Sequence, residues 1–366
     1  VLVGMVMPAD STLMLSALGI SDFVRFDRAE GLALGGGIAS RFGHGVDAVV
    51  RARYGIDDRT VKGRATLEWQ SPRYGIRAFG LRDFRDAGDV QERSGAVNSI
   101  AAQEFGADAS DPFGVQGLGL GLDAHDVAGV RLALDAAWER QRPLAIRATP
   151  AQGRYPRILP ATPLRALRLA LSAERPTTMS VFGTEVRARG ELRLSRLTTV
   201  DASVPVPATT LGRAFVTLEV QRPFGRSRLA LTTAGGAVGA NGPIPAQDWL
   251  YFGGPVSSPG YAYHELAGLV GLTQRVEWQT PVPAPAIPLG RFGKAPGVAT
   301  LAPFLQGTLV RRALDTDLAH PTGVYPAAGV ALQPFFDMLR LQVARGLRNG
   351  RWTFDVDVSR EFWGIL

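Results

Sequence analysis

The chain has 366 residues, no cysteine, 43 glycines and a formal net charge of +7. The lack of cysteine excludes a disulfide framework and a thiolate metal site. A window of about 20 uncharged apolar residues is also lacking, which excludes a transmembrane helix. Because the arginines are spread singly along the chain, the positive charge does not indicate nucleic-acid binding. No cofactor is expected.

The first 28 residues, 1–28, are weakly patterned, and an amphipathic segment, a first strand or a linker would each fit them. The apolar stretch from Val1 to Ile20 is broken by Asp10 and lacks a basic start, so it is a poor signal peptide. We therefore set 1–28 apart as an N-terminal segment and treat 29–366 as one domain. A chain that begins at Val1 is expected to be a mature or trimmed product.

From Glu30 onward, apolar and polar residues alternate with period two, which places successive side chains on opposite faces of a sheet. The predicted strands are 30–42, 46–56, 61–70, 74–84, 113–123, 130–140, 165–175, 183–197, 212–222, 226–238, 266–280, 298–312, 324–334, 337–346 and 351–362. These are fifteen segments, whereas a closed bacterial barrel has an even number of strands. One strand is therefore expected to be hidden, before Glu30 or between Thr177 and Val206.

Three long connections interrupt the strands. The insert from Asp83 to Phe113 contains a short helical spacing, and the connection from Arg142 to Pro163 is rich in proline and arginine. The stretch from Gln247 to Tyr261 holds too many glycines and prolines for a regular strand, so it is predicted to be a loop whose aromatic rings fold back into a cavity. Loops of this length in a compact fold are usually functional or disordered.

The predicted strands have the length that crosses a bilayer at a tilt, about 9–11 residues, whereas strands of soluble proteins commonly have about 5–6. Trp69, Trp138, Trp278 and Trp352 lie at or near segment ends, where an interfacial belt would place them. We therefore predict an all-β fold, a closed antiparallel transmembrane β-barrel of about 16 strands whose apolar faces contact lipid and whose charges face the lumen. A soluble multi-sheet protein is the alternative.

The last predicted strand has the clearest alternation, with Thr353, Asp355 and Asp357 on its polar face. Its apolar face carries Trp352, Phe354, Val356, Val358 and Phe362. Outer-membrane barrels present such an aromatic C-terminal strand to their assembly machinery. These five residues are therefore the predicted C-terminal strand signal.

The stretch Phe252-Gly253-Gly254, followed by Pro259-Gly260-Tyr261 and then by Glu277 and Pro281, resembles the bacterial surface antigen family of outer-membrane barrels, the BamA and TamA type. In that family a loop between the eleventh and twelfth of sixteen strands turns into the lumen. The resemblance implies such a lumen loop here, with Glu277 and Gln306 as its partners on the strands. The implied lumen-loop residues are Trp249, Tyr251, Phe252, Gly253, Gly254, Pro259, Gly260 and Tyr261.

The loop tip departs from the family pattern, because the family's arginine falls at Pro259 and its inward aspartate falls near Gln306. Losing one charge would leave the other unpaired at a cost of several kcal/mol, whereas losing both avoids that cost. The loop is therefore expected to fold inward without the charge pair, held by Tyr251, Phe252 and Tyr261.

The resemblance implies a protein of the bacterial outer membrane that inserts or translocates outer-membrane proteins, with a weak seam between its first and last strands. A porin-like channel, or an anchor and partner for another envelope protein, is the alternative. The expected partners are outer-membrane lipid and lipopolysaccharide, and other envelope proteins or unfolded barrel substrates. POTRA repeats are not recognisable in this chain. An enzyme is not expected, because the four histidines share no metal-ligand spacing and a Gly-x-Ser-x-Gly turn is lacking.

Overall fold

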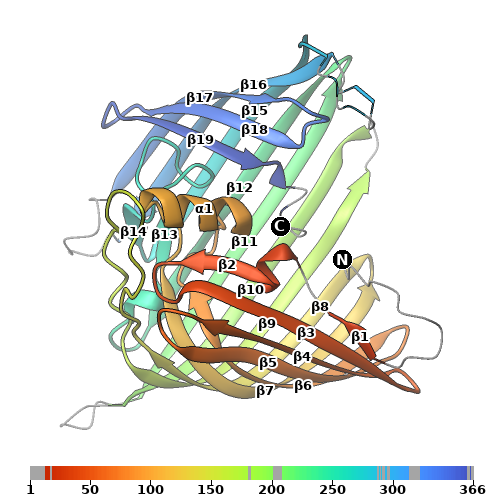
Figure 1. The fold of residues 1–366 in the computed structure, drawn as a ribbon, viewed down its shortest axis with the longest axis vertical. Helices are drawn as coiled ribbons and strands as arrows, with labels where there is room; N and C mark the ends of the chain where they lie inside the picture. The colour runs from red at the N-terminus through yellow and green to blue at the C-terminus, as the bar shows by residue number, and fades with distance from the viewer. Residues whose placement is uncertain are drawn as a thin grey trace.

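The computed structural model describes residues 13–16, 19–179, 183–200, 208–286, 288, 290, 293–294, 297–312, 322–360 and 363. Most of them form one large antiparallel sheet, which curls around a short helix and two small strands (Figure 1). Within these residues, none of the helices is long and apolar enough to cross a membrane. Phe362 of the predicted C-terminal strand signal lies outside the described residues.

The elements follow the chain as a series of hairpins. The first half contains β1 (Leu13–Leu15), η1 (Ile20–Asp22), β2 (Val24–Asp27), β3 (Gly31–Gly43), β4 (Val46–Gly55), β5 (Thr60–Gln70), β6 (Tyr74–Asp86), α1 (Gly95–Phe105), β7 (Pro112–Val127), β8 (Val130–Arg142) and β9 (Leu164–Met179). The second half contains β10 (Glu185–Thr199), β11 (Thr209–Phe224), β12 (Ser227–Ala240), η3 (Ala246–Asp248), β13 (Leu250–Phe252), β14 (Leu266–Gly268), β15 (Val270–Pro283), β16 (Val298–Arg311), β17 (Gly323–Gln333), β18 (Leu339–Gly346) and β19 (Trp352–Val358).

Each strand from β2 to β12 pairs antiparallel with the next one, and β12 pairs with β15, after which the series continues to β19. The described sheet thus contains eleven strands from β2 to β12 and five from β15 to β19. The fifteen predicted segments are confirmed with small shifts at their ends, with one correction: 266–280 is divided into β14, which pairs with β13, and β15.

The hidden strand lies before Glu30, where β1 and β2 both pair with β3 and are separated by the 3₁₀ turn η1. This first strand is therefore interrupted. The two ends of this series, β2 and β19, both contact α1, which lies between them (Figure 1). Consecutive strands of the series from β2 to β19 pair in a residue-by-residue register. The described residues show no such register between β19 and β2.

The outer face of the sheet is apolar. In β7, Leu118 and Leu120 are 67% and 63% exposed, and Leu169 of β9 and Val356 of β19 are exposed as well. The four tryptophans near the strand ends are also exposed. These side chains therefore do not meet in a dry centre, and their exposure fits a sheet whose outer face contacts acyl chains.

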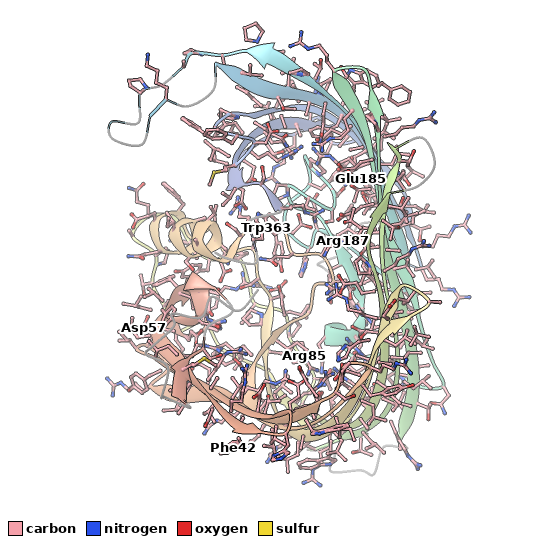
Figure 2. All side chains as sticks on the ribbon, turned by 90° about the vertical axis from the view of Figure 1, so that its right-hand side faces the viewer. Phe42, Asp57, Arg85, Glu185, Arg187 and Trp363 are labelled. Atoms are coloured by element: carbon pink, nitrogen blue, oxygen red, sulfur yellow. The ribbon has the colours of Figure 1, made fainter. Side chains whose placement is uncertain are left out.

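The inner face carries charges that pair across strands. Arg77 bonds Asp123 at 2.6 Å and Asp135 at 2.8 Å, and Arg85, seen inside the curve of the sheet in Figure 2, bonds Glu139 at 2.8 Å. Cross-strand pairs of opposite charge stabilise a sheet and neutralise charge in a partly desolvated interior. The polar faces of the predicted strands therefore lie inside.

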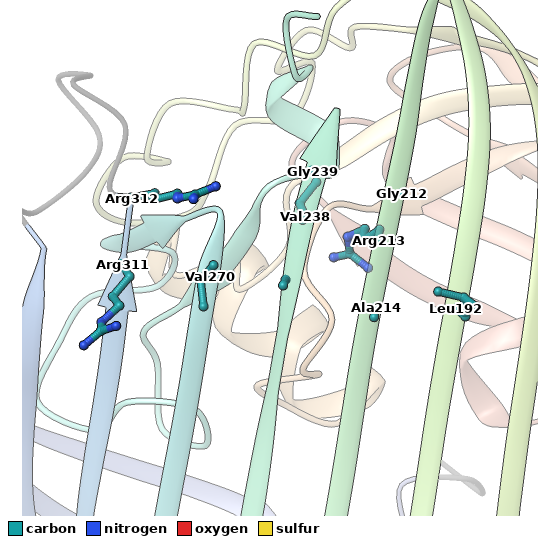
Figure 3. Close-up of a pocket in the computed structure, with 10 residues that line it drawn as sticks. Leu192, Gly212, Arg213, Ala214, Val238, Gly239, Val270, Arg311 and Arg312 are labelled. Carbon is teal, nitrogen blue, oxygen red and sulfur yellow. The ribbon is translucent and has the colours of Figure 1, made fainter. Parts of the chain in front are cut away.

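A groove of about 520 Å³ lies across β10 to β12, β15 and β16 (Figure 3). Small residues leave room between Leu192 and Val270, namely Gly212, Ala214, Ala237 and Gly239, and most of the lining is apolar. Arg213 lines the groove, but its guanidinium bonds Asp89 and the backbone oxygen of Asp248 on the inner side. The groove therefore belongs to the apolar exterior of the sheet, where Leu192 is exposed.

Candidate functional site: a loop cluster on the inner face

The connection between β12 and β15, which we call the inner loop (241–269), folds as a separate small hairpin. Its strands β13 and β14 pair with each other, and its tip lies between them. Gly254 and Gly260 have φ angles of 115° and 84°, a region that L side chains rarely adopt. A Cβ on Gly260 would also lie 2.1 Å from the backbone nitrogen of Gly346. The glycines therefore allow the tip to approach the sheet closely.

Three aromatic side chains of the inner loop are buried, those of Tyr251, Phe252 and Tyr261. Phe252 and Tyr261 pack in one apolar cluster with residues of β11 and β16, and Tyr251 packs in a second cluster with Phe113 of β7. Trp249 is only half-buried, and its indole N–H donates to the backbone oxygen of Ile244 at 3.0 Å. Burial of rings of this size is a large part of what holds such a loop in place.

The tip is fixed to β15 and β16 by neutral hydrogen bonds. The Nε2 of Gln306 donates to the backbone oxygens of Val256 at 2.8 Å and Ser257 at 2.7 Å. The Ser257 oxygen also accepts from Thr273 Oγ1 at 2.7 Å and from Thr308 Oγ1 at 3.0 Å. An amide thus contacts the tip at the position where the family resemblance would place an aspartate.

The end of the tip reaches the last strands. The backbone N–H of Gly260 donates to Thr353 Oγ1 of β19 at 3.1 Å, and its oxygen accepts from Asn349 in the turn before β19 at 3.1 Å. Tyr261 donates to the backbone oxygen of Pro326 in β17 at 3.1 Å. Pro259, beside Gly260, is buried. The inner loop therefore touches the inner face from β15 to β19.

Glu277 forms a charge cluster and reaches the loop only indirectly. Its carboxylate bonds Arg275 at 2.9 Å and Arg340 at 2.6 Å. Arg275 donates at 2.9 Å to the Oε1 of Gln342, whose Nε2 donates at 2.9 Å to the backbone oxygen of Pro255 in the loop. Gln306 contacts the tip directly, whereas the contact of Glu277 runs through Gln342.

The sequence did not reveal a third partner, Glu92, which lies in the insert between β6 and β7. Its buried carboxylate accepts from the backbone N–H of Val256 at 2.7 Å and of Ser257 at 3.1 Å. Burial raises the pKa of Glu92, and its hydrogen bonds to Ser257 and Val256 oppose that shift only in part. The helical spacing of the insert gave no sign of this residue, because nothing local marks a carboxylate that meets a distant loop.

Asp111, the last residue before β7, joins four connections. Its carboxylate binds Arg28 of the β2–β3 turn, His264 Nδ1 of the inner loop at 2.7 Å, and the backbone N–H of Leu159 in the β8–β9 connection at 3.2 Å. His264 also stacks on Tyr263 with ring centroids 3.8 Å apart. The turn, the insert, the β8–β9 connection and the inner loop are therefore interlocked at one end of the sheet.

Four of the five residues of the predicted C-terminal strand signal lie in β19. Trp352, Phe354 and Val356 are exposed on the outer face, and Val358 ends the strand half-buried. Within the described ranges, no group of three or more His, Cys, Asp or Glu side chains is placed to hold a metal ion. The site consists of a packed, hydrogen-bonded loop whose tip contacts the last strand.

Family models do not match the sequence, and curated proteins do not match it either. Among solved structures, the chain is similar to BamA from Haemophilus ducreyi lacking POTRA domains 1-3, with 13% identity over 91% of this chain and 68% of that one and a TM-score of 0.57. The chain is also similar to CdiB from Acinetobacter baumannii, with 12% identity over 92% of this chain and 58% of that one and a TM-score of 0.47. For CdiB from Escherichia coli the identity is 12% over 97% of this chain and 62% of that one, with a TM-score of 0.45. The chain therefore spans about three fifths of either CdiB. Its fold is similar to that of the BamA chain.

Proposed function

We propose that the sheet closes into a barrel of sixteen strands in a bacterial outer membrane and that the inner loop lies in its lumen. Helix α1 contacts both β2 and β19, the two ends of the strand series, and this supports closure. The apolar exterior and the paired charges of the interior support a membrane location. The contacts of Gln306 and Glu92 with the tip support the position of the loop.

We further propose that this barrel inserts outer-membrane proteins into the membrane or translocates proteins across it. The observation that carries the proposal is the place of the inner loop, between the eleventh and twelfth of sixteen strands on a BamA-like fold. The junction of β2 with β19 gives the barrel a weak point, because β2 has four residues, β19 has seven, and the first strand is interrupted by η1. An unfolded barrel substrate would enter at this seam.

The test is reconstitution of the full-length protein in liposomes, followed by addition of a urea-denatured outer-membrane barrel. We expect the substrate to gain its folded, heat-modifiable form faster than in liposomes that contain an unrelated porin. Depletion of the protein in its own bacterium should leave other barrels unassembled. Equal folding rates in the two liposome preparations, together with unchanged levels of outer-membrane proteins on depletion, would refute the role.

A porin-like channel is distinguished by conductance. The interlocked connections fill one end of the sheet, so we expect little current in planar bilayers, and an increase when the segment from Trp249 to Tyr261 is deleted. A large conductance of the intact protein would favour the channel instead. A protein that neither conducts nor inserts barrels, but is recovered in a stable complex with another envelope protein, would support the role of an anchor.

A further inference from the structure

Helix α1 lies at the junction between the first and the last strand. It belongs to the insert between β6 and β7, yet it contacts both β2 and β19, and Figure 1 shows it between these two strands. Ser94 caps its N-terminus by accepting from the backbone N–H of Val97, and Gly106 ends it with a left-handed φ of 65°. The caps at both ends define a complete helix of eleven residues placed at the seam.

The N-terminal end of the helix is bound to β19. The backbone N–H of Ser94 donates to Asp357 at 2.8 Å, and its hydroxyl donates to the other carboxylate oxygen at 2.6 Å. Arg93 bonds Asp355, the next inward-facing residue of β19, at 3.1 Å. Hydrogen bonds to a carboxylate are stronger than neutral ones, so two consecutive residues of the insert hold the last strand.

The helix and the residues just after it also bind β2 and the turn that follows β2. The backbone N–H of Phe26 donates to Ser99 Oγ at 3.1 Å, and the backbone N–H of Arg28 donates to Asp108 at 2.9 Å. Asn98 donates to the same Asp108 carboxylate at 3.0 Å. One edge of β2 pairs with β3. The backbone N–H of Phe26 donates to the helix from the other edge, where a neighbouring strand would otherwise accept it. The helix thus occupies part of the pairing edge of β2.

The helix is held mainly by these polar contacts. Ala102 is its only buried residue, whereas Ile100 and Phe105 are 61% and 62% exposed. Little apolar surface would be uncovered if the helix moved away, and elements with few buried apolar contacts open at low free energy. Glu92, two residues before Ser94, binds the tip of the inner loop, so the same short segment touches the loop, β19 and the helix.

We propose that α1 is a releasable latch: it blocks the pairing edge of β2, ties β2 to β19, and must leave this position before the seam can accept an incoming strand. The inference rests on the insertion role proposed above and names its regulation. Because Glu92 joins the latch to the inner loop, movement of the loop tip and release of the latch are coupled.

The test uses the natural lack of cysteine. In the double variant Ser94→Cys/Asp357→Cys the two side chains replace a hydrogen-bonded pair, and oxidation would lock the helix to β19. We expect insertion of a denatured barrel into liposomes to be lost on oxidation and to return on reduction. The matched control is Arg131→Cys/Glu174→Cys, which bridges directly opposed residues of β8 and β9. Its oxidation should leave insertion unchanged.

If the locked and the reduced protein insert barrels equally well, the latch is refuted while the insertion role stands. If the reduced protein and the parent protein both fail to insert barrels, the insertion role is refuted, and a second measurement decides about the latch. Spin labels at Gln103→Cys and Val24→Cys report the distance from α1 to β2. A longer distance should gain population when Ser99→Ala and Asp357→Asn are added, and one unchanged distance would overturn the proposal.

Discussion

Replacing Gln306 by leucine tests whether neutral hydrogen bonds hold the tip of the inner loop. The change keeps a side chain of similar size and removes the donor to the Val256 and Ser257 oxygens. The Ser257 oxygen keeps its bonds from Thr273 and Thr308, whereas the Val256 oxygen loses the amide donor. A net hydrogen bond contributes about 1 kcal/mol, and a buried acceptor left unpaired costs about 1–3 kcal/mol.

Part of this loss is recovered, because the Oε1 of Gln306 is buried without a hydrogen-bond partner in the described structure, and leucine removes it. We therefore expect the free energy of tip opening to fall by about 2 kcal/mol. Since about 1.4 kcal/mol changes an equilibrium tenfold, the open population should rise roughly 30-fold.

The assay is the rate at which a thiol at the tip is modified. Ser258 is fully buried and its Oγ has no hydrogen-bond partner within the described residues, so Ser258→Cys gives a single thiol that reacts only when the tip opens. The matched control is Gln279→Leu, which removes a glutamine that bonds Glu277 and Arg228. Equal rates in the parent and the Gln306→Leu protein would refute the reasoning, as would an equal increase in the control.

Three further variants test the charge clusters and the insert. Glu277→Ala leaves two largely buried arginines without their carboxylate and should lower the free energy of unfolding by about 3 kcal/mol, measured by urea titration in detergent; an unchanged midpoint would contradict this. Asp111→Ala should free the four interlocked connections and make 143–163 sensitive to protease, whereas resistance like that of the parent would show that apolar packing suffices. Burial raises the pKa of Glu92, so the neutral carboxyl is favoured in the folded site. Tip attachment is therefore strongest below the ordinary pKa of a glutamate and is lost as pH rises from there through the raised pKa. The labelling rate of the Ser258→Cys thiol should therefore increase with pH, after correction for the ionisation of the same thiol measured in the unfolded protein. Glu92→Gln should remove this pH dependence. The same slope of rate against pH in both proteins would argue against a role of Glu92.

The regular part of the fold could be predicted from the sequence because it depends on neighbouring residues. Alternation with period two places Leu118 and Leu120 on one face and glycines on the other, whichever strand lies beside them. Dense glycine and proline likewise mark the inner loop, because they prevent a regular strand locally. The insert was expected to be a loop with a short helical spacing, and α1 lies in it.

Long-range contacts decided the rest. A strand before Glu30 could be expected only as one of two alternatives, because β1 and β2 are three and four residues long. Only their shared pairing with β3 identifies them as parts of one strand. The sequence pattern does not indicate that Glu92 binds a loop more than 160 residues away. Nor does it indicate that Ser99 accepts a hydrogen bond from Phe26 of β2, 73 residues before it. Sequence alone thus determined which segments are strands and which face of each is apolar, since backbone geometry fixes both locally. Only the tertiary structure decided how the connections interlock and where α1 lies, because those contacts form between residues that become neighbours only after the sheet has curled.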